Sequence, residues 1–377
     1  MIEFSKAVDA GIATSMPICA GTRDAQGIWT PDQTRKWFEF TRAVGGEIAA
    51  AEYFNEPTVA GMGGAPEGYD GEAYGRDFDI FRKFAEEFAP DMLIHGPGSV
   101  GETTEGALID YGNAGFITTP DLLSGMGYGV KALDAFSFHH YAAVSIRCEG
   151  VGPQTTVDAA LSEEWLSGVG STMDFYRQQR DLSVPDAPLW NTETGETACG
   201  GNPWAKTFLD TFRYLDQLGR SAKGGVTVHF HNTLAASDYA LISDQDFSPR
   251  PSYWAALLWR NLMGTTVLDA QVPLQAGQHV YAHCLRGTPG GVAVLAINND
   301  PSVPRTLNLP VDGERYTLSA AELQAEEVQL NGRTLALGEG DAVPELTGEA
   351  VAAGEITLEP ATITFLALPN AGNSACQ

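Results

Sequence analysis

The sequence has few basic side chains. Lysine and arginine together number 22 against 48 aspartates and glutamates, so the formal net charge is −26 over 377 residues. Nucleic acids and anionic membranes attract proteins through basic surfaces, and both are therefore poor partners for this chain. A long polyanionic substrate would also be repelled at long range, although a local basic cleft could overcome that repulsion.

Long apolar runs and closely spaced cysteines are also missing. No stretch of about 18 apolar residues occurs, so the sequence predicts no membrane-spanning helix. The opening segment Met1–Lys6 leads into no long apolar run and is not a signal peptide. None of the five cysteines stands in a C-x-x-C pair, which argues against a zinc or redox site. Cys148 and Cys199 fall in loops that we expect on one face of the fold; a disulfide between them is one hypothesis, and two unpaired thiols the alternative.

Short apolar runs alternate with longer amphipathic stretches over residues 1–264, a pattern typical of βα units and a parallel sheet. We expect strands near Gly11–Ile18, Ile48–Phe54, Met92–Gly96, Ala135–His140, Pro188–Glu193 and Gly225–Phe230. The expected helices are Pro31–Val44, Tyr74–Phe88, Trp204–Leu218 and Ser252–Met263. The pattern predicts an α/β fold, a TIM-type (β/α)8 barrel over residues 1–264.

The pattern changes after residue 264. Helical stripes disappear, and short β-rich runs such as Val292–Ile297 and Ile363–Leu368 follow one another, separated by Gly, Pro, Asn and Asp. This predicts a C-terminal antiparallel β-sandwich domain over residues 265–377, with a short frayed tail from Pro369.

The number of strands is lower than a complete barrel requires. A (β/α)8 barrel has eight strands, and only six are indicated here. Our hypothesis is that the first two βα units are missing, because the chain is a fragment or its start was set at an internal methionine. Any signal peptide would have been lost with the missing part, and we expect the parent protein to be secreted or periplasmic.

The clearest chemical signal is the tripeptide Asn55-Glu56-Pro57 at the end of a strand of small residues. Residues at the carboxyl ends of barrel strands point into the active site. A carboxylic acid there can protonate a glycosidic oxygen, and the neighbouring Asn55 can hydrogen-bond a sugar 2-hydroxyl. A solvated glutamate in an ordinary turn is the alternative interpretation.

A second carboxylate ends the strand near Pro188–Glu193. A retaining glycosidase needs two carboxyl groups about 5–5.5 Å apart, one as acid/base and one as nucleophile. Two strand ends across a barrel mouth could supply that distance. Glu193 and Glu196 compete for the role of nucleophile, and we favour Glu193 because it stands at the strand end.

Other polar groups follow strand ends. His139 could bridge the substrate and the acid, and Tyr141 could keep a nucleophilic carboxylate ionised; a packed core role is the alternative for one of the two adjacent histidines, His139 and His140. His229 and His231 could line a pocket or cap the barrel. No His, Asp and Glu triplet has metal-ligand spacing. The backbone N–H groups near Gly195, Gly200 and Gly201 could bind a carboxylate, unless this loop is simply flexible.

The ordered motifs resemble glycoside hydrolase family 79, the heparanase and β-glucuronidase family, from about Val8 to Leu268. The resemblance rests on Phe54-Asn55-Glu56-Pro57, His95-Gly96-Pro97-Gly98, Phe138-His139-His140-Tyr141, Trp190-Asn191-Thr192-Glu193-Thr194 with Cys199-Gly200-Gly201, and Ser237-Asp238-Tyr239-Ala240-Leu241. Asn-Glu-Pro alone is shared across the wider clan of retaining barrels, whereas the ordered set is far more specific.

The resemblance implies β-glucuronide hydrolysis by double displacement with retention. Glu56 would match the acid/base, Glu193 the nucleophile, and Tyr141 the tyrosine beside the nucleophile. Three residues would match the groups that hold the glucuronate carboxylate: Gly200, Gly201 and Tyr239. Asn55 would match the residue that binds the sugar 2-hydroxyl. No metal or other cofactor is implied, and the expected partner is a β-glucuronide-containing glycan or glycoside.

Two alternatives stay open. The chain could be a related clan hydrolase that acts on a neutral sugar, such as a xylosidase or an arabinofuranosidase. It could also be an inactive truncated remnant that only binds carbohydrate. Between exo- and endo-acting enzymes, the charge of −26 favours an exo-acting β-glucuronidase, because Arg147 is the only arginine near the motifs that could serve a heparan-type chain.

Overall fold

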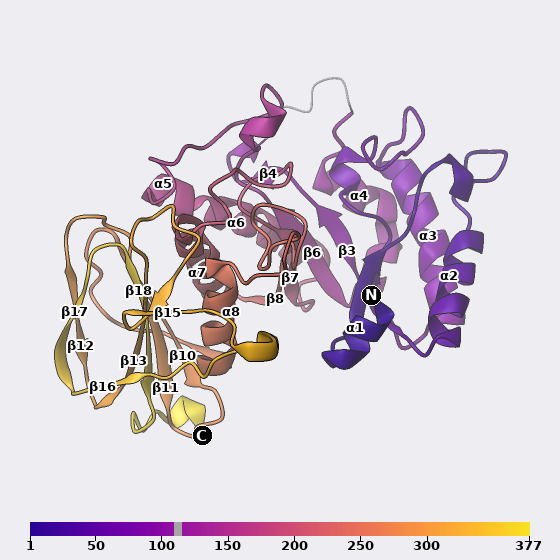
Figure 1. The fold of residues 1–377 in the computed structure, drawn as a ribbon. Coiled ribbons are helices and arrows are strands. Elements are labelled where there is room, and N and C mark those ends of the chain that lie inside the picture. Colours follow the sequence, from indigo (N-terminus) through magenta and orange to yellow (C-terminus); the bar gives the residue numbers. More distant parts are fainter. Residues whose placement is uncertain (109–114) are drawn as a thin grey trace. The chain divides into compact units, whose positions relative to one another are not determined.

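The computed structural model describes residues 1–108 and 115–377, which form two compact units (Figure 1). Each unit collects segments that are far apart in the sequence. The first contains Met1–Tyr141, Ser171–Thr194 and Val226–Phe230, and the second contains Ala142–Gly170, Gly195–Gly225 and His231–Gln377. The predicted domain boundary at residues 264 and 265 stays a prediction, since these units follow compactness and not the order of the chain.

The first unit is built on a six-stranded sheet in which each strand lies beside its predecessor. Its members are β1 (Ile12–Ser15), β2 (Ile48–Glu52), β3 (Leu93–Ser99), β6 (Ala135–His140), β7 (Leu189–Thr194) and β8 (Val226–His231). The pairings from β1 through β7 are parallel, so the carboxyl ends of these strands share one edge of the sheet. The predicted strands and their βα arrangement are therefore confirmed.

Helices connect these strands. They are α1 (Ile2–Ala7), α2 (Asp32–Ala43), α3 (Gly71–Phe88), α4 (Thr119–Met126) and α6 (Gly168–Ser183), together with the 3-10 helices η1 (Ala20–Thr22), η2 (Pro57–Val59) and η4 (Gly127–Ala132). The helix expected from Tyr74 begins earlier, because the side chain of Asp70 accepts a hydrogen bond from the N–H of Ala73 and caps the first turn. Phe78 and Phe81, on the predicted apolar stripe, are buried in the core of the unit.

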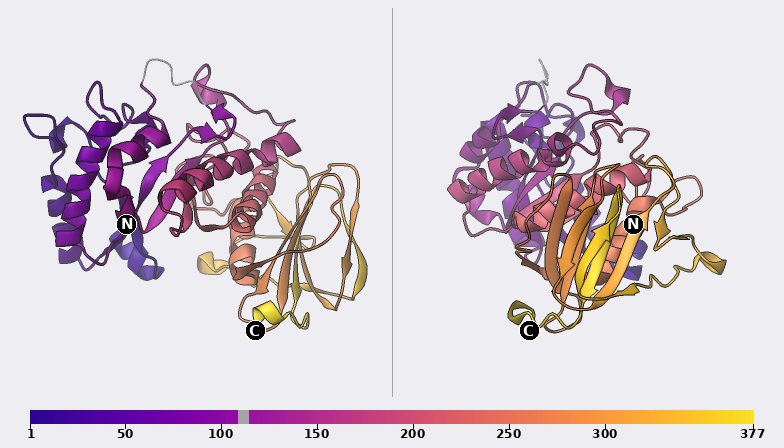
Figure 2. Two further views of the ribbon diagram at one scale, coloured as in Figure 1. Left: turned by 180° about the vertical axis from the view of Figure 1, so that it is seen from behind. Right: turned by 90° about the vertical axis from the view of Figure 1, so that its left-hand side faces the viewer.

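The second unit contains an antiparallel sandwich, as the sequence predicts (Figure 2). The larger sheet has the order β15-β14-β13-β18-β11-β10-β9, with β16 paired to β13, and the smaller sheet pairs β12 with β17. The strands are β9 (Met263–Leu268), β10 (Gln278–Leu285), β11 (Val292–Asn298), β12 (Arg305–Leu309), β13 (Gly313–Ser319), β14 (Gln329–Leu330), β15 (Arg333–Thr334), β16 (Glu349–Val351), β17 (Gly354–Leu358) and β18 (Thr362–Leu368).

The two faces of the larger sheet pack against different partners. Val280 of β10 lies in an apolar cluster with Leu307 and Ile356 of the smaller sheet. Tyr281, the next residue, lies in a cluster with side chains of α7 (Phe208–Lys223) and α8 (Pro251–Leu262). Alternate residues of a strand point to opposite faces, so one strand serves both layers. Within the described residues, no helix combines the length and the apolar character needed to cross a membrane.

Two local expectations for the second unit were wrong. The helix predicted to stop before Gly219 continues to Lys223, because the missing side chain of Gly219 leaves room for the ring of Tyr281. The tail predicted to fray is held in place. Cys376 forms a disulfide with Cys284 of β10, and its carbonyl oxygen accepts a hydrogen bond of 2.7 Å from the N–H of Gly290.

The close contact between α3 and α4 gives a test of the fold. A side chain at Gly75 would overlap the backbone carbonyl of Gly125, and backbone cannot move aside cheaply. We expect Gly75→Ala to lower the free energy of unfolding by about 2 kcal/mol, the usual cost of overpacking, despite the better helix propensity of alanine. Urea unfolding followed by circular dichroism measures the difference.

The matched control is Gly170→Ala in α6, where a new methyl group would meet no atom within 4 Å. Its free energy of unfolding should stay the same or rise slightly. Equal stability of the two alanine variants would contradict the packing described for α3 and α4.

Candidate active site

Glu56 stands just beyond the carboxyl end of β2, where it precedes the 3-10 helix η2. Its backbone adopts a left-handed conformation with φ of 52°. A residue with a Cβ atom is unfavourable there, and such strained positions cluster at functional sites. The Glu56 side chain is 19% exposed, so solvent reaches it. Asn55, its neighbour in the chain, is exposed.

Glu193 lies near the carboxyl end of β7, the strand predicted to carry the second carboxylate. Tyr141 follows β6, and its hydroxyl donates a hydrogen bond of 2.7 Å to Oε1 of Glu193. The side chain of Glu193 is 29% exposed. This hydrogen bond fixes the orientation of the Glu193 carboxyl group.

His139 of β6 joins the two carboxyl groups. Its Nδ1 atom lies 3.1 Å from Oε1 of Glu56 and 3.9 Å from Oε2 of Glu193. One side-chain atom from each of these three residues lies within 4.8 Å of the other two. A carboxyl oxygen of Glu56 is therefore no more than 4.8 Å from one of Glu193. The structure thus brings together three of the predicted site residues from strands that are far apart in the sequence.

The charge state of His139 follows from its surroundings. Burial on its own would lower the pKa of this imidazole. The hydrogen bond to Glu56 and the negative charges of the surrounding carboxyl groups outweigh burial and raise the pKa to about 9. The ring therefore binds a proton more tightly than a free imidazole does, and the contact of 3.1 Å lets it share that proton with Glu56.

The same three groups have the composition of a cation site, although their sequence spacing gives no sign of it. A proton on the ring of His139 competes with a cation for the Nδ1 atom.

The sequence patterns gave no functional role to two titratable residues inside the sheet, Glu52 and His95. Glu52, the last residue of β2, is 5% exposed, and burial raises its pKa to about 8. Burial and the charge of His139 lower the pKa of His95 on β3 to about 3. The available signal was a glutamate within the otherwise apolar run Ile48–Phe54.

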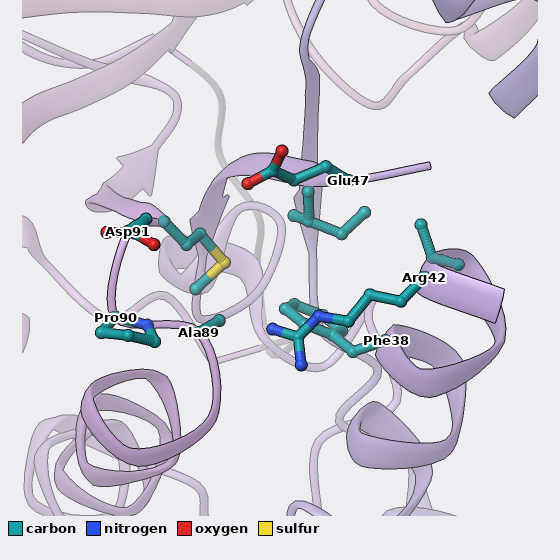
Figure 3. Close-up of a pocket in the computed structure, with 9 residues that line it drawn as sticks. Phe38, Arg42, Glu47, Ala89, Pro90 and Asp91 are labelled. Atoms are coloured by element: carbon teal, nitrogen blue, oxygen red, sulfur yellow. The ribbon is translucent and has the colours of Figure 1, made fainter. Parts of the chain in front are cut away.

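The pocket drawn in Figure 3 belongs to another part of the first unit. Its lining includes Ile48 at the start of β2 and Met92, which precedes β3. These are the amino ends of the strands, whereas Glu56 follows the carboxyl end of β2. The geometry of this pocket therefore has no part in the chemistry of the three residues.

The predicted carboxylate-binding residues lie together in the second unit. Gly200 and Gly201 both have φ of 81°, a conformation that favours glycine. A side chain at Gly195 or at Gly201 would collide with the ring of Tyr239, at 2.8 and 2.7 Å. Glycine allows another group to approach the backbone closely at these positions.

Cross-links hold this loop in one conformation. Cys148 and Cys199 form a disulfide, the pair considered from the sequence. Arg147 donates to the carbonyl oxygens of Gly200 and Gly201 and pairs with Asp238.

The residues beside Tyr239 are fixed as well. Arg250 donates to the carbonyl oxygens of Ser237 and Asp238 at 2.5 and 2.8 Å. His231 donates through Nε2 to the carbonyl oxygen of Tyr239 at 2.7 Å. From the sequence, this histidine could line a pocket or cap the barrel.

Glu196, the second candidate for the nucleophile, braces the loop. It is 2% exposed, and its oxygens accept from the backbone N–H of Asn202 at 2.8 Å, from its side-chain amide at 3.0 Å and from Thr197 at 2.8 Å. A carboxyl group with its oxygens occupied by neighbouring donors is poorly placed to attack a sugar. These contacts favour Glu193 over Glu196 as the nucleophile.

The chain resembles known proteins in sequence, although no protein-family model matches it. It is 32% identical to heparanase of Gallus gallus over 68% of this chain and 50% of that protein. It is 31% identical to baicalin-beta-D-glucuronidase of Scutellaria baicalensis over 77% of this chain and 57% of that protein. The chain thus spans between half and three fifths of the length of these two relatives.

Among solved structures, the fold is similar to a 4-O-alpha-L-rhamnosyl-beta-D-glucuronidase from Fusarium oxysporum. The TM-score is 0.69 at 15% identity, over 97% of this chain and 79% of that one. At such low identity the likeness supports the fold class alone. The two sequence relatives carry the assignment further, and they agree with the ordered motifs. In sequence, the chain is thus similar to the heparanase and β-glucuronidase family, glycoside hydrolase family 79.

Proposed function

We propose that this chain hydrolyses β-linked glucuronides by double displacement with retention, with Glu56 as acid/base and Glu193 as nucleophile. One observation carries the proposal: carboxyl oxygens of the two residues lie within 4.8 Å of each other. Retaining enzymes place their carboxyl groups about 5–5.5 Å apart, whereas inverting enzymes need about 6.5–9.5 Å to admit a water molecule.

The proposed reaction uses Glu56 twice, first as an acid and then as a base. Glu193 attacks the anomeric carbon and forms a glycosyl ester, while Glu56 gives its proton to the departing oxygen. Water then attacks the ester, Glu56 takes a proton from that water, and Glu193 leaves as a carboxylate. Before the first step, the proton that Glu56 gives away is shared with His139, whose Nδ1 atom lies 3.1 Å from Oε1 of Glu56.

Tyr141 and Asn55 complete the proposed reaction centre. The hydroxyl of Tyr141 donates a hydrogen bond to Glu193 and orients it for attack. Asn55 takes the sugar 2-hydroxyl, a contact that strengthens in the transition state. Asn55 is exposed, which leaves it free to meet a substrate.

The carboxylate of the glucuronide is proposed to bind Gly200, Gly201 and Tyr239. The left-handed glycines and the adjacent phenol support this, because both provide N–H or O–H donors for an anion. Arg147 is already paired with Asp238. Its charge is therefore partly neutralised, which favours an exo-acting β-glucuronidase over an enzyme that cleaves long sulfated chains.

Replacing the two carboxyl groups separates their roles. With an aryl β-D-glucuronide whose leaving group needs protonation, Glu56→Gln should lower kcat by about 10²–10⁴-fold, the contribution of a general acid. With a nitrophenolate leaving group that departs without a proton, the glycosylation step of this variant should recover. Glu193→Gln should be inactive on both substrates. Glu87→Gln, an exposed residue of α3, is the control.

A mechanism-based inhibitor identifies the nucleophile independently. A 2-deoxy-2-fluoro glucuronide with a good leaving group should form a stable ester, which peptide mass spectrometry locates. We expect the label on Glu193. A label on Glu196, or no stable ester from an enzyme that does turn over glucuronides, would contradict the assignment.

Carboxylate recognition is tested by Tyr239→Phe. Loss of one hydrogen bond to a charged group should lower kcat/KM for an aryl β-D-glucuronide about 10- to 100-fold. Activity on the matching aryl β-D-xyloside, which lacks the carboxylate, should change far less. Tyr128→Phe is the control, since Tyr128 is 97% exposed. Equal losses on both sugars would favour a hydrolase of neutral sugars.

A further inference from the structure

A third carboxyl group interacts electrostatically with Glu56 and Glu193. Glu52 ends β2, is 5% exposed, and its Oε2 atom accepts no hydrogen bond from the described residues. Removing a charged carboxylate from water without a partner is very costly. A glutamine or an apolar residue would fill this place more cheaply, so the presence of a carboxyl group needs an explanation.

The neighbouring strand is shaped around this group. Gly98 of β3 has φ of 74°, and a Cβ atom there would overlap Oε2 of Glu52 and lie 3.0 Å from its Cδ atom. Any other residue at position 98 would be strained by its backbone and would displace the carboxyl group. The space for Glu52 is thus a specific feature of β3.

The groups that face Glu52 come from several elements. Nδ1 of His95 on β3 is 3.8 Å from Oε2 of Glu52, which is too long for a hydrogen bond, and it meets the Ser137 hydroxyl at 3.1 Å instead. Electrostatic interactions also couple Glu52 to His139 on β6, Glu193 on β7, Glu56 before η2 and Tyr74 on α3.

Two protonation states follow from this environment. Burial, together with the negative charges of Glu193 and Glu56, raises the pKa of Glu52 to about 8 against the opposing effect of His139. Glu52 is therefore neutral in mildly acidic solution and becomes charged above about pH 8. Its negative charge in turn helps to raise the pKa of His139.

We propose that Glu52 is a positioning residue of the active site, whose buried carboxyl group sets how firmly His139, and through it Glu56, holds the catalytic proton. The role in catalysis rests on the function proposed above. As the pH rises, Glu52 ionises and its new negative charge favours the protonated form of the His139–Glu56 pair. The negative charge of Glu52 therefore extends to higher pH the range in which the His139–Glu56 pair keeps its proton.

The first test follows titration in the wild-type chain and needs no substrate turnover; two variants serve only to assign the signals. Carbon-13 NMR of glutamate-labelled protein should show one carboxyl group titrating near pH 8, absent from the spectrum of Glu52→Gln. The imidazole resonance of His139, assigned by its loss in His139→Asn, should respond to the same ionisation, since coupled groups titrate together. No glutamate titrating between about pH 7 and 9, or an imidazole curve without this second inflection, would overturn the proposal.

The second test compares variants. In Glu52→Gln the titration of His139 and the alkaline limb of kcat/KM should both move to lower pH by about one unit. Glu102→Gln is the matched control, because Glu102 is also buried but accepts its hydrogen bonds from Thr119. A purely structural role would lower activity at every pH and leave the alkaline limb where it is.

The outcomes separate this inference from the proposed function. A chain that hydrolyses no glucuronide defeats the proposed function, while the two NMR titrations still decide whether Glu52 controls His139. A chain that hydrolyses glucuronides with superimposable pH profiles for wild type and Glu52→Gln defeats only the inference. If Glu52→Gln does not fold, the coupled titration in the wild-type chain decides whether the inference holds.

Discussion

Repulsion between carboxyl groups is the constraint on which this site depends. Two unit negative charges within 4.8 Å repel by roughly 3 kcal/mol at an effective dielectric constant of about 20. A proton held by Glu56 or by His139 offsets this repulsion, because Nδ1 of His139 is 3.1 Å from Glu56 and 3.9 Å from Glu193. The parallel strands β2, β6 and β7 make the arrangement possible by ending at one edge of the sheet. A proton shared by Glu56 and His139 therefore allows the two glutamates to lie close together.

The sequence revealed those parts of the site that follow local rules. Glu56 and Glu193 were predicted because each ends a short apolar strand, and parallel strands bring such ends together. The register of β6 against β7 shifts between Phe138 and His139, immediately before the residue that contacts both glutamates. A sequence pattern does not contain such shifts.

The missed features depend on contacts between distant segments. In the sequence, Glu52 is one residue of an apolar strand. The space for its buried carboxyl group depends on the left-handed Gly98 of another strand, which the sequence pattern does not place beside it. Gly219 looked like a helix end until Tyr281 was found against it, and the tail looked free until Cys376 was found joined to Cys284. In each case a long-range contact overrode a local preference.

The second unit shows how a flexible sequence becomes a fixed surface. Residues Gly195–Gly201 are rich in glycine and would be mobile on their own. The Cys148–Cys199 disulfide, the Arg147 contacts to two carbonyl oxygens and the ring of Tyr239 hold them in one conformation. Preorganised donors lose little entropy when they bind an anion, which suits recognition of a sugar carboxylate in a chain with a net charge of −26.

The central claim is that Glu56 and Glu193 are close enough for a covalent intermediate. Proton NMR during the first minutes of hydrolysis of an aryl β-D-glucuronide tests it most directly, because the anomeric proton reports the first-formed product. Our account predicts the β-anomer of glucuronic acid first, followed by slow mutarotation. The α-anomer as the first product would require direct attack by water and would contradict the account.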